Sequence, residues 1–259
     1  MDVPGLGETI FIDGYPQISQ CDQYRFNEII IHSSLCATPH PRRVFIAGVA
    51  SGGNVREALR HPGVETVIAA DIDQEAIELF QGSLSYWNAG ALSDPRVTLQ
   101  FMDARDSLAE SAGDFDAIVI DLPDPLPGKA TRRLFTREFC QVAREKLSAH
   151  GVIMTQAGRL RLNALQYHAD VATTYRSVFQ STIVLNAYIA CYYEPWAFLL
   201  GSPRMDLESL GPKLIDARLQ ARGIADLQFY SGEAHAAMQF MPKEILDRLN
   251  GLGAIQRDA

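Results

Sequence analysis

Short apolar runs alternate with helical patterns along the middle of this chain. The runs have the length and continuous hydrophobicity of strands that are buried on both faces of a parallel sheet. They lie at Val44–Gly48, Thr66–Ala70, Val97–Phe101, Ala117–Asp121 and Val152–Gln156. Helical patterns follow them at Asn54–Arg60, Gln74–Ser85, Arg105–Ser111, Thr136–Leu147 and Asn163–Phe179. This alternation predicts an α/β fold with a mostly parallel sheet and helices on both faces.

The part of the chain after this alternation predicts the far edge of the sheet. Two further β-rich runs, Ser181–Cys191 and Trp196–Gly201, should finish the sheet as an antiparallel pair. Helical stretches at Asp206–Arg222 and Pro242–Leu249 then enclose a loop around Tyr230–His235.

The part before the alternation predicts a small cap. Residues Glu8–Asp22 alternate in polarity and contain a Gly-Tyr-Pro turn, which is typical of a β-hairpin. Pro39 and Pro41 mark the boundary that follows. We therefore expect a cap segment over residues 1–38 and a Rossmann-like catalytic domain over residues 39–259.

Composition narrows the class of protein. The 259 residues are 47% hydrophobic and 21% charged, enough for one large buried core. The net charge of −8 argues against a dedicated nucleic-acid binder, which normally needs a basic surface. The four cysteines form no CxxC pair, and no apolar run approaches the length of about 18 residues that a membrane span needs. We expect a cytoplasmic protein with reduced thiols, no membrane partner and no metal.

A glycine turn is the strongest chemical signal. The apolar run that begins at Val44 ends in the turn Gly48–Gly53, and Asp71 follows 23 residues after Gly48. Backbone N–H groups at the start of the next helix would face the end of the strand, and Asp71 would reach the hydroxyls of a ribose. This pattern predicts a nucleoside site. A tight turn with a solvated aspartate is the structural alternative.

Three further aspartates follow predicted strands. Asp103 comes after the third strand, where a carboxylate commonly accepts the amine of an adenine, and it could equally cap the helix at Arg105. Asp121 and Asp124 follow the fourth strand on either side of a proline. Two carboxylates in a rigid turn can orient an amine and accept its proton, although an Asx turn would also explain them.

Together these motifs resemble the spermidine synthases and related polyamine aminopropyltransferases, with their putrescine N-methyltransferase offshoot. The matching segments are Ile12–Gln17 with Asp22 and Glu28, Pro39–Val44, Arg56–Glu65, Asp94–Val97 with Asp103, Phe115–Asp121 with Asp124-Pro125, and Phe229–Tyr230 with His235–Ala237. The resemblance implies a class I methyltransferase-like sheet of seven strands and a homodimer. Only a hairpin's length of chain precedes Gln17, whereas the family has a longer N-terminal strand domain.

The resemblance also implies roles for individual residues. The cosubstrate would be S-adenosylmethionine or its decarboxylated form, and the residues that would hold it are Gln17, Gly48, Ser51, Gly52, Asp71, Asp103 and Ala104. Asp121 matches the proton-accepting aspartate of the family, and Asp124 matches the residue that grips the acceptor amine. The acceptor would lie against Phe26, Asn27, Arg159 and either Tyr192 or Tyr193.

Departures from the family pattern cluster in the substrate half of the site. Ser51 replaces an aspartate that contacts the free amine of the decarboxylated donor. Gly158 stands where the family usually has a glutamate for the far end of a diamine. Phe26 replaces a tyrosine and Asn27 a Gln or His, and the lid Pro125–Leu134 adds Lys129, Arg132 and Arg133.

These departures leave more than one function open. Aminopropyl transfer to a small amine is the first expectation. Methyl or aminocarboxypropyl transfer from intact S-adenosylmethionine, or its cyclisation, is the alternative, with an amino-acid-like acceptor whose carboxylate meets Arg159 or a lid arginine. A catalytically silent nucleoside-binding protein is the third.

Overall fold

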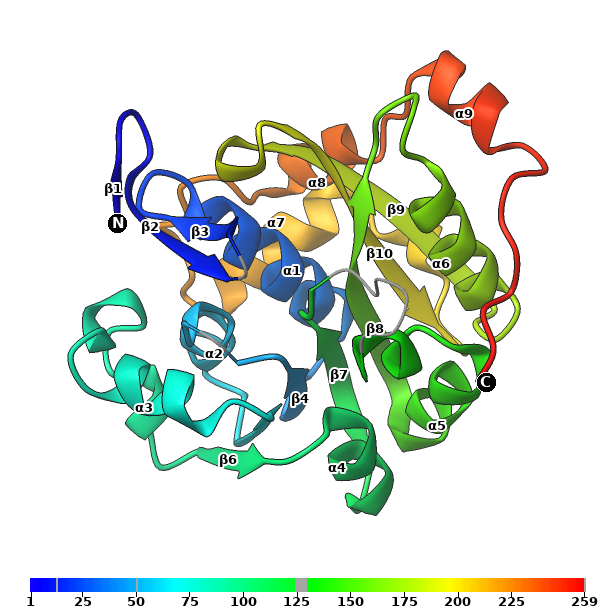
Figure 1. Ribbon diagram of the computed structural model, residues 1–259. Coiled ribbons are helices and arrows are strands. Elements are labelled where there is room, and N and C mark those ends of the chain that lie inside the picture. The colour runs from blue at the N-terminus through cyan, green and yellow to red at the C-terminus, as the bar shows by residue number, and fades with distance from the viewer. Residues whose placement is uncertain (13, 50, 124–129, 259) are drawn as a thin grey trace.

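The computed structural model describes residues 1–12, 14–49, 51–123 and 130–258 (Figure 1). Its main sheet has seven strands in the order β6-β5-β4-β7-β8-β10-β9. The strands from β6 to β8 are parallel, and β10 runs antiparallel to both β8 and β9. This sheet confirms the predicted fold and its antiparallel final pair. The strands are β4 (Arg43–Ala47), β5 (Thr66–Asp71), β6 (Val97–Phe101), β7 (Phe115–Ile120), β8 (Leu147–Arg159), β9 (Ser181–Ile189) and β10 (Glu194–Ser202).

Helices cover both faces of this sheet. They are α1 (Gln23–Ala37), α2 (Gly53–Leu59), α3 (Gln74–Gln81), α4 (Ala104–Glu110), α5 (Arg137–Lys146), α6 (Gln166–Arg176), α7 (Pro212–Ala221), α8 (Gly232–Met238) and α9 (Lys243–Leu249). Figure 1 shows α1 and α2 on one side of the central strands and α5 and α6 on the other. Within the described chain, no helix is both long and apolar enough to cross a membrane.

The alternation of side chains along β4 explains the two layers. Val44 and Ile46 belong to the core that packs under α1, α2, α3, α7 and α8. Phe45 and Ala47 belong to the opposite core, under α4, α5, α6 and α9. Because successive side chains of a strand point to opposite faces, a strand buried on both sides must be apolar throughout. The continuous apolar runs in the sequence have this origin.

Helix α1 was absent from the sequence prediction. Every residue from Phe26 to Ala37 is buried, so the helix has no polar face that would produce an amphipathic pattern. Its polar side chains have partners within the protein: the Glu28 carboxylate accepts the backbone N–H groups of Gln228, Phe229 and Tyr230 at 2.8–2.9 Å. These three hydrogen bonds offset the cost of burying the negatively charged carboxylate of Glu28.

Helix α8 lies where the sequence predicted a loop. The Ser231 hydroxyl accepts the backbone N–H of Ala234 and caps the helix at its start. The helix has seven residues, which is too short for a periodic pattern to stand out.

The N-terminal cap is a three-stranded antiparallel sheet of β1 (Asp2–Val3), β2 (Gly7–Ile12) and β3 (Tyr15–Ser19). The predicted hairpin is its β2–β3 pair, and the short strand β1 extends it. Helix α1 follows the cap and packs against β7 and β8 of the main sheet. The division of the chain at residue 38 stays a prediction.

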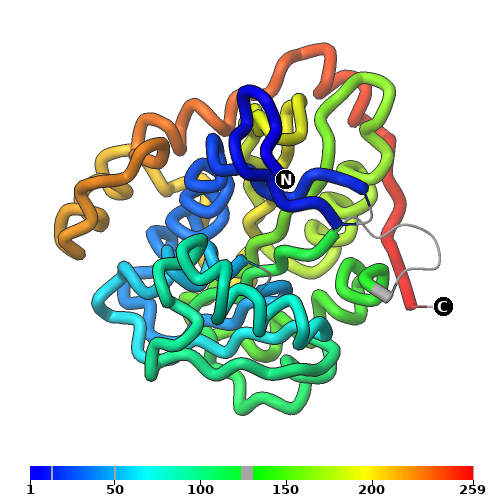
Figure 2. The backbone as a smooth tube through the Cα atoms, turned by 60° about the vertical axis from the view of Figure 1, so that its left-hand side comes forward, coloured from blue at the N-terminus to red at the C-terminus, as the bar shows by residue number. Residues whose placement is uncertain are grey.

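The C-terminal segment runs along one side of the molecule (Figure 2). It is held at the start of α5, where the backbone N–H of Arg137 donates to the Gln256 carbonyl at 2.8 Å and the Thr136 hydroxyl donates to Asp258 at 2.9 Å. Arg105 also pairs with Asp258, at 2.6 Å. The chain end thus ties α4 to α5.

Candidate functional site

Gly48 lies where the sheet order reverses, between the ends of β5 and β7. Its N–H donates to the Ala70 carbonyl at 3.0 Å, and the N–H of Asp121 donates to the Ala47 carbonyl at 2.8 Å. The φ of Gly48 is +84°, and a Cβ at this position would lie 1.9 Å from the Asp121 carbonyl oxygen. Only glycine fits here. Ligands of open α/β sheets bind outside the strand ends at this kind of reversal.

Asp71 ends β5 beside this glycine. One carboxylate oxygen accepts the N–H of Val49 at 2.8 Å, and the other accepts the N–H of Asp73 at 3.0 Å. The carboxylate therefore orders the second residue of the glycine turn as well as the turn after β5. Its predicted contact with ribose is compatible with this position.

Asp121 is partly exposed at the end of β7, and its carboxylate is held by Asn54. The Nδ2 of Asn54 donates to Oδ2 of Asp121 at 2.6 Å. Desolvation raises the pKa of Asp121 to about 7, with the hydrogen bond from Asn54 lowering it and the charge of Asp71 raising it. A carboxyl group with this pKa is suited to accept a proton near neutral pH. Sequence reasoning missed Asn54, although it directly follows the glycine turn.

Ser51 and Gly52 lie buried inside the glycine turn. The Ser51 hydroxyl accepts the N–H of Gly53 at 3.4 Å, and its carbonyl accepts Nδ2 of Asn88 at 2.9 Å. On the other side of the turn, a Cβ at Gly53 would lie 2.2 Å from Nδ2 of Asn27. The predicted acceptor residue Asn27 thus packs against the backbone of the predicted donor loop.

Asp103 caps α4. Its carboxylate accepts the backbone N–H of Arg105 at 2.8 Å, and Arg133 lies 3.7 Å away. Ala104, the first residue of the helix, is buried. The capping role that the sequence allowed is confirmed, and the contact with adenine stays a prediction.

An aromatic wall of Phe26, Tyr192 and Trp196 stands next to Gln17. Tyr192 lies 6.3 Å from Phe26 and 4.6 Å from Trp196 between ring centroids, and its hydroxyl donates to the Gln17 carbonyl at 2.9 Å. Tyr193 is 66% exposed. Of the two tyrosines, Tyr192 is the one that joins the predicted site residues.

Gln156 connects this wall to the loop after β7, and the sequence analysis did not single it out. Its Nε2 donates to the Leu122 carbonyl at 2.8 Å, and its Oε1 accepts Nε1 of Trp196 at 3.0 Å. The indole ring is therefore held at a fixed place beside the residue that follows Asp121.

Arg159 lies at the outer end of the wall. Its Nε donates to Glu194 at 2.8 Å, and the guanidinium lies 5.8 Å from the Trp196 ring centroid. Arg161 binds the other oxygen of Glu194 at 2.7 Å. The cluster of Arg159, Arg161 and Glu194 holds two positive charges and one negative charge. A Cβ at Gly158 would meet the Tyr167 ring at 2.3 Å, so the glutamate of the family has no room here.

The lid is only partly described. Asp124 and Lys129 lie outside the described residues. Of the lid arginines, Arg133 is 54% exposed and lies 3.9 Å from Asp106. His235, in the C-terminal part, is buried and bonded to the Tyr230 hydroxyl at 2.9 Å, as expected of a structural histidine.

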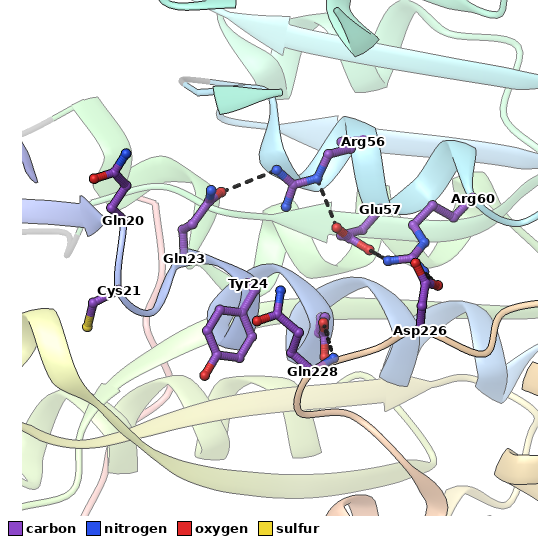
Figure 3. A pocket seen from close by; sticks show the side chains of 10 residues that line it. Gln20, Cys21, Gln23, Tyr24, Arg56, Glu57, Arg60, Asp226 and Gln228 are labelled. Carbon is purple, nitrogen blue, oxygen red and sulfur yellow. Dashed lines mark hydrogen bonds and ion pairs between the residues drawn. The ribbon is translucent and has the colours of Figure 1, made fainter. Parts of the chain in front are cut away.

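A polar cavity of about 350 Å³ lies between α1, α2 and the segment before α8 (Figure 3). None of the predicted site residues lines it. Its charged groups are paired: Arg56 and Arg60 both bind Glu57, and Arg60 also binds Asp226. The cavity is thus separate from the strand ends that carry Asp71 and Asp121.

Comparisons with known proteins agree with this geometry. A family model, the spermine/spermidine synthase domain, matches residues 23–207. Polyamine aminopropyltransferase 2 of Hyperthermus butylicus is 34% identical over 241 residues, which cover 93% of this chain and 79% of the relative. The polyamine aminopropyltransferase of Pyrobaculum calidifontis is 34% identical over 252 residues, with 93% and 84% covered.

Solved structures show the same fold. A spermidine synthase from Thermotoga maritima matches with a TM-score of 0.85 and 25% identity, over 96% of this chain and 82% of that one. The family match spans most of the chain and includes Gly48, Asp71, Asp103 and Asp121. The chain belongs to the spermine/spermidine synthase family.

Proposed function

We propose that this protein transfers an aminopropyl group from decarboxylated S-adenosylmethionine to a small amine. The observation that carries the proposal is the carboxylate of Asp121, with a pKa raised to about 7, at the strand ends that also carry Gly48 and Asp71. This base stands beside a turn suited to a nucleoside. Membership of the family supplies the reaction class.

The reaction is a displacement at carbon. The lone pair of the acceptor nitrogen forms a C–N bond to the propyl carbon next to sulfur, and the C–S bond breaks. Its electron pair stays on sulfur, which becomes a neutral thioether in methylthioadenosine. The nitrogen loses one proton, which Asp121 accepts. The aromatic wall would hold the alkyl part of the acceptor in line with this bond.

The proton-accepting role makes turnover depend on pH. Below about 7 the Asp121 carboxyl is protonated and neutral, so it cannot take the proton from the amine. We expect kcat/KM to fall by a further factor of about ten for each pH unit below this pKa, in addition to any dependence on the neutral fraction of the amine. The measurement is a pH profile with several amines of different basicity. The limb of Asp121 should stay near pH 7 for every amine, whereas a limb that moves with the basicity of the amine belongs to the substrate. A profile with only the moving limb would contradict this assignment.

Ser51 supports intact S-adenosylmethionine as a second candidate donor. A hydroxyl at this place would tolerate a donor that carries a carboxylate as well as an amine, whereas the aspartate of the family would repel it. Transfer of a methyl or aminocarboxypropyl group, or cyclisation, would then follow.

Calorimetric titration with both donors and with methylthioadenosine, followed by mass spectrometry of the products, separates these functions. The proposal predicts methylthioadenosine and an aminopropylated amine from the decarboxylated donor. Adenosylhomocysteine from the intact donor would show methyl transfer instead, and methylthioadenosine from it would show aminocarboxypropyl transfer or cyclisation. If no nucleoside bound, the transferase functions would be contradicted, and so would the alternative of a catalytically silent nucleoside-binding protein.

The variant Ser51→Asp extends this test. A carboxylate in the turn should bind the donor amine and raise the preference for the decarboxylated donor about tenfold or more, since a charge-assisted hydrogen bond contributes about 1.5–3 kcal/mol. Ser51→Asn is the matched neutral control. Equal preferences in both variants would show that residue 51 does not face the donor amine.

The cluster of Arg159, Glu194 and Arg161 has one net positive charge, which favours an acceptor without a second ammonium at that end. Putrescine should therefore be compared with amino-acid acceptors. Assembly into a homodimer and a cytoplasmic location stay predictions by analogy with the family.

A further inference from the structure

Asn54 has one satisfied and one unsatisfied polar atom beside the catalytic aspartate. The residue is 4% exposed. Nδ2 donates to Asp121 at 2.6 Å, while Oδ1 is buried and has no hydrogen-bond partner among the described residues. A buried amide oxygen without a partner costs about 1–3 kcal/mol. Native proteins keep such an atom mainly where a function, an ordered water or a bound molecule accounts for it.

The two atoms belong to one planar carboxamide, so the position of one fixes the other. Because Nδ2 is held against Asp121 and both atoms are bonded to the same carbon, Oδ1 also lies near this carboxylate. The missing partner must be a donor. In the proposed reaction, the amine substrate is the molecule that brings N–H groups to Asp121.

We propose that Asn54 binds the acceptor amine together with Asp121, so that Oδ1 of Asn54 accepts one N–H while Asp121 accepts the other. This inference rests on the proposed function. A neutral primary amine has two N–H groups and one lone pair. With both N–H groups held by these two oxygens, the lone pair has a single direction left, toward the carbon that is attacked. Asn54 also orients Asp121 through Nδ2.

Among the residues that the structure describes, Asp121 is influenced by the amide of Asn54 and by the charge of Asp71, at the end of β5. Asp71 raises the pKa of Asp121 and the hydrogen bond from Asn54 lowers it. Loss of the amide should therefore move the acidic limb of the pH profile upward.

The test compares the native enzyme with Asn54→Leu, which keeps the branched shape and removes both polar atoms. We expect kcat/KM for a primary amine to fall about tenfold or more, the acidic limb to move up by about one pH unit, and donor affinity to stay unchanged. The variant Asn54→Asp keeps an acceptor oxygen but adds a second charge, so its limb should move further up. It provides a second measurement where the leucine variant folds poorly.

A chemical comparison isolates the second N–H. The N-methyl derivative of the same amine has only one N–H in its neutral form. The native enzyme should prefer the primary amine by a ratio about tenfold larger than the ratio in Asn54→Leu, because the variant has no acceptor for the second N–H. Equal ratios in the two proteins would overturn the proposed contact.

A measurement without turnover separates this inference from the proposed function. Carbon-13 NMR of labelled aspartate gives the pKa of Asp121 directly, with the resonance assigned by its loss in Asp121→Asn. A higher pKa in Asn54→Leu than in the native protein supports the pairing even if the reaction differs from the proposed one. The same pKa in both proteins would overturn the role of Asn54, while product formation by the native enzyme would still establish the function.

Discussion

Replacing Asp121 with asparagine should reduce turnover about 10³-fold while the affinity for the nucleoside donor stays nearly unchanged. The amide has almost the shape of the carboxylate but cannot accept the proton of the amine. The backbone N–H of Asp121, which bonds to Ala47, is unaffected, so the strand end should keep its geometry. Single-turnover kinetics and calorimetric titration with the donor measure the two quantities.

A matched control separates the base from the general charge of this edge. Glu75, in the first turn of α3, is exposed, and Glu75→Gln removes the same charge a few residues from Asp71. It should change turnover little. If Asp121→Asn instead lost donor affinity and kept its turnover, Asp121 would be a binding residue for the donor and not the base.

Replacing Gly48 with alanine should destabilise the protein by about 2–5 kcal/mol and strongly reduce turnover. The left-handed backbone costs an L-residue about 1–2 kcal/mol. In addition, the new Cβ would lie 1.9 Å from the Asp121 carbonyl, and the relief of such an overlap costs about 1–3 kcal/mol. Relief of this overlap would shift the backbone of Asp121, which is the proposed base. Urea unfolding followed by circular dichroism gives the free energy of unfolding.

Gly5 offers the control for this experiment. Its φ of +82° is close to the +84° of Gly48, yet a Cβ there would have nothing within 4 Å. Gly5→Ala should therefore show only the backbone cost of about 1–2 kcal/mol and near-native turnover. Equal losses of stability in the two variants would contradict the close approach of Gly48 and Asp121.

The sequence predicted the fold where burial produces a regular pattern. The strands β4, β5 and β7 and the second half of β8 are apolar because both of their faces are covered, and this run of hydrophobicity is visible without a structure. Helix α1 is covered on all sides, so it has no alternation of polar and apolar positions. Its buried Glu28 and His32 look like surface residues in the sequence, and only their distant partners explain them.

The candidate site was predictable to the extent that the chemistry lies at strand ends. Gly48, Asp71 and Asp121 each directly follow or end a strand, and the parallel sheet brings them to one edge. Asn54 acts through a side-chain hydrogen bond to Asp121, which is 67 positions away in the chain. Gln156 acts through a side-chain hydrogen bond to Leu122, which is 34 positions away. No local pattern marks such a bond. Ser51, in contrast, was noticed because it departs from the family.

The bonds between Glu28 and the segment Gln228–Tyr230 also set an order of events during synthesis. The two partners are 200 residues apart in the chain. At a translation rate of about 5–20 residues per second, Gln228–Tyr230 are synthesised about 10–40 s after Glu28. Only then are the three N–H groups present that make the burial of the Glu28 carboxylate favourable. Until then, α1 cannot pack against the sheet without burying the unpaired charge of Glu28. The native core of this protein should therefore close only after residue 230 has left the ribosome.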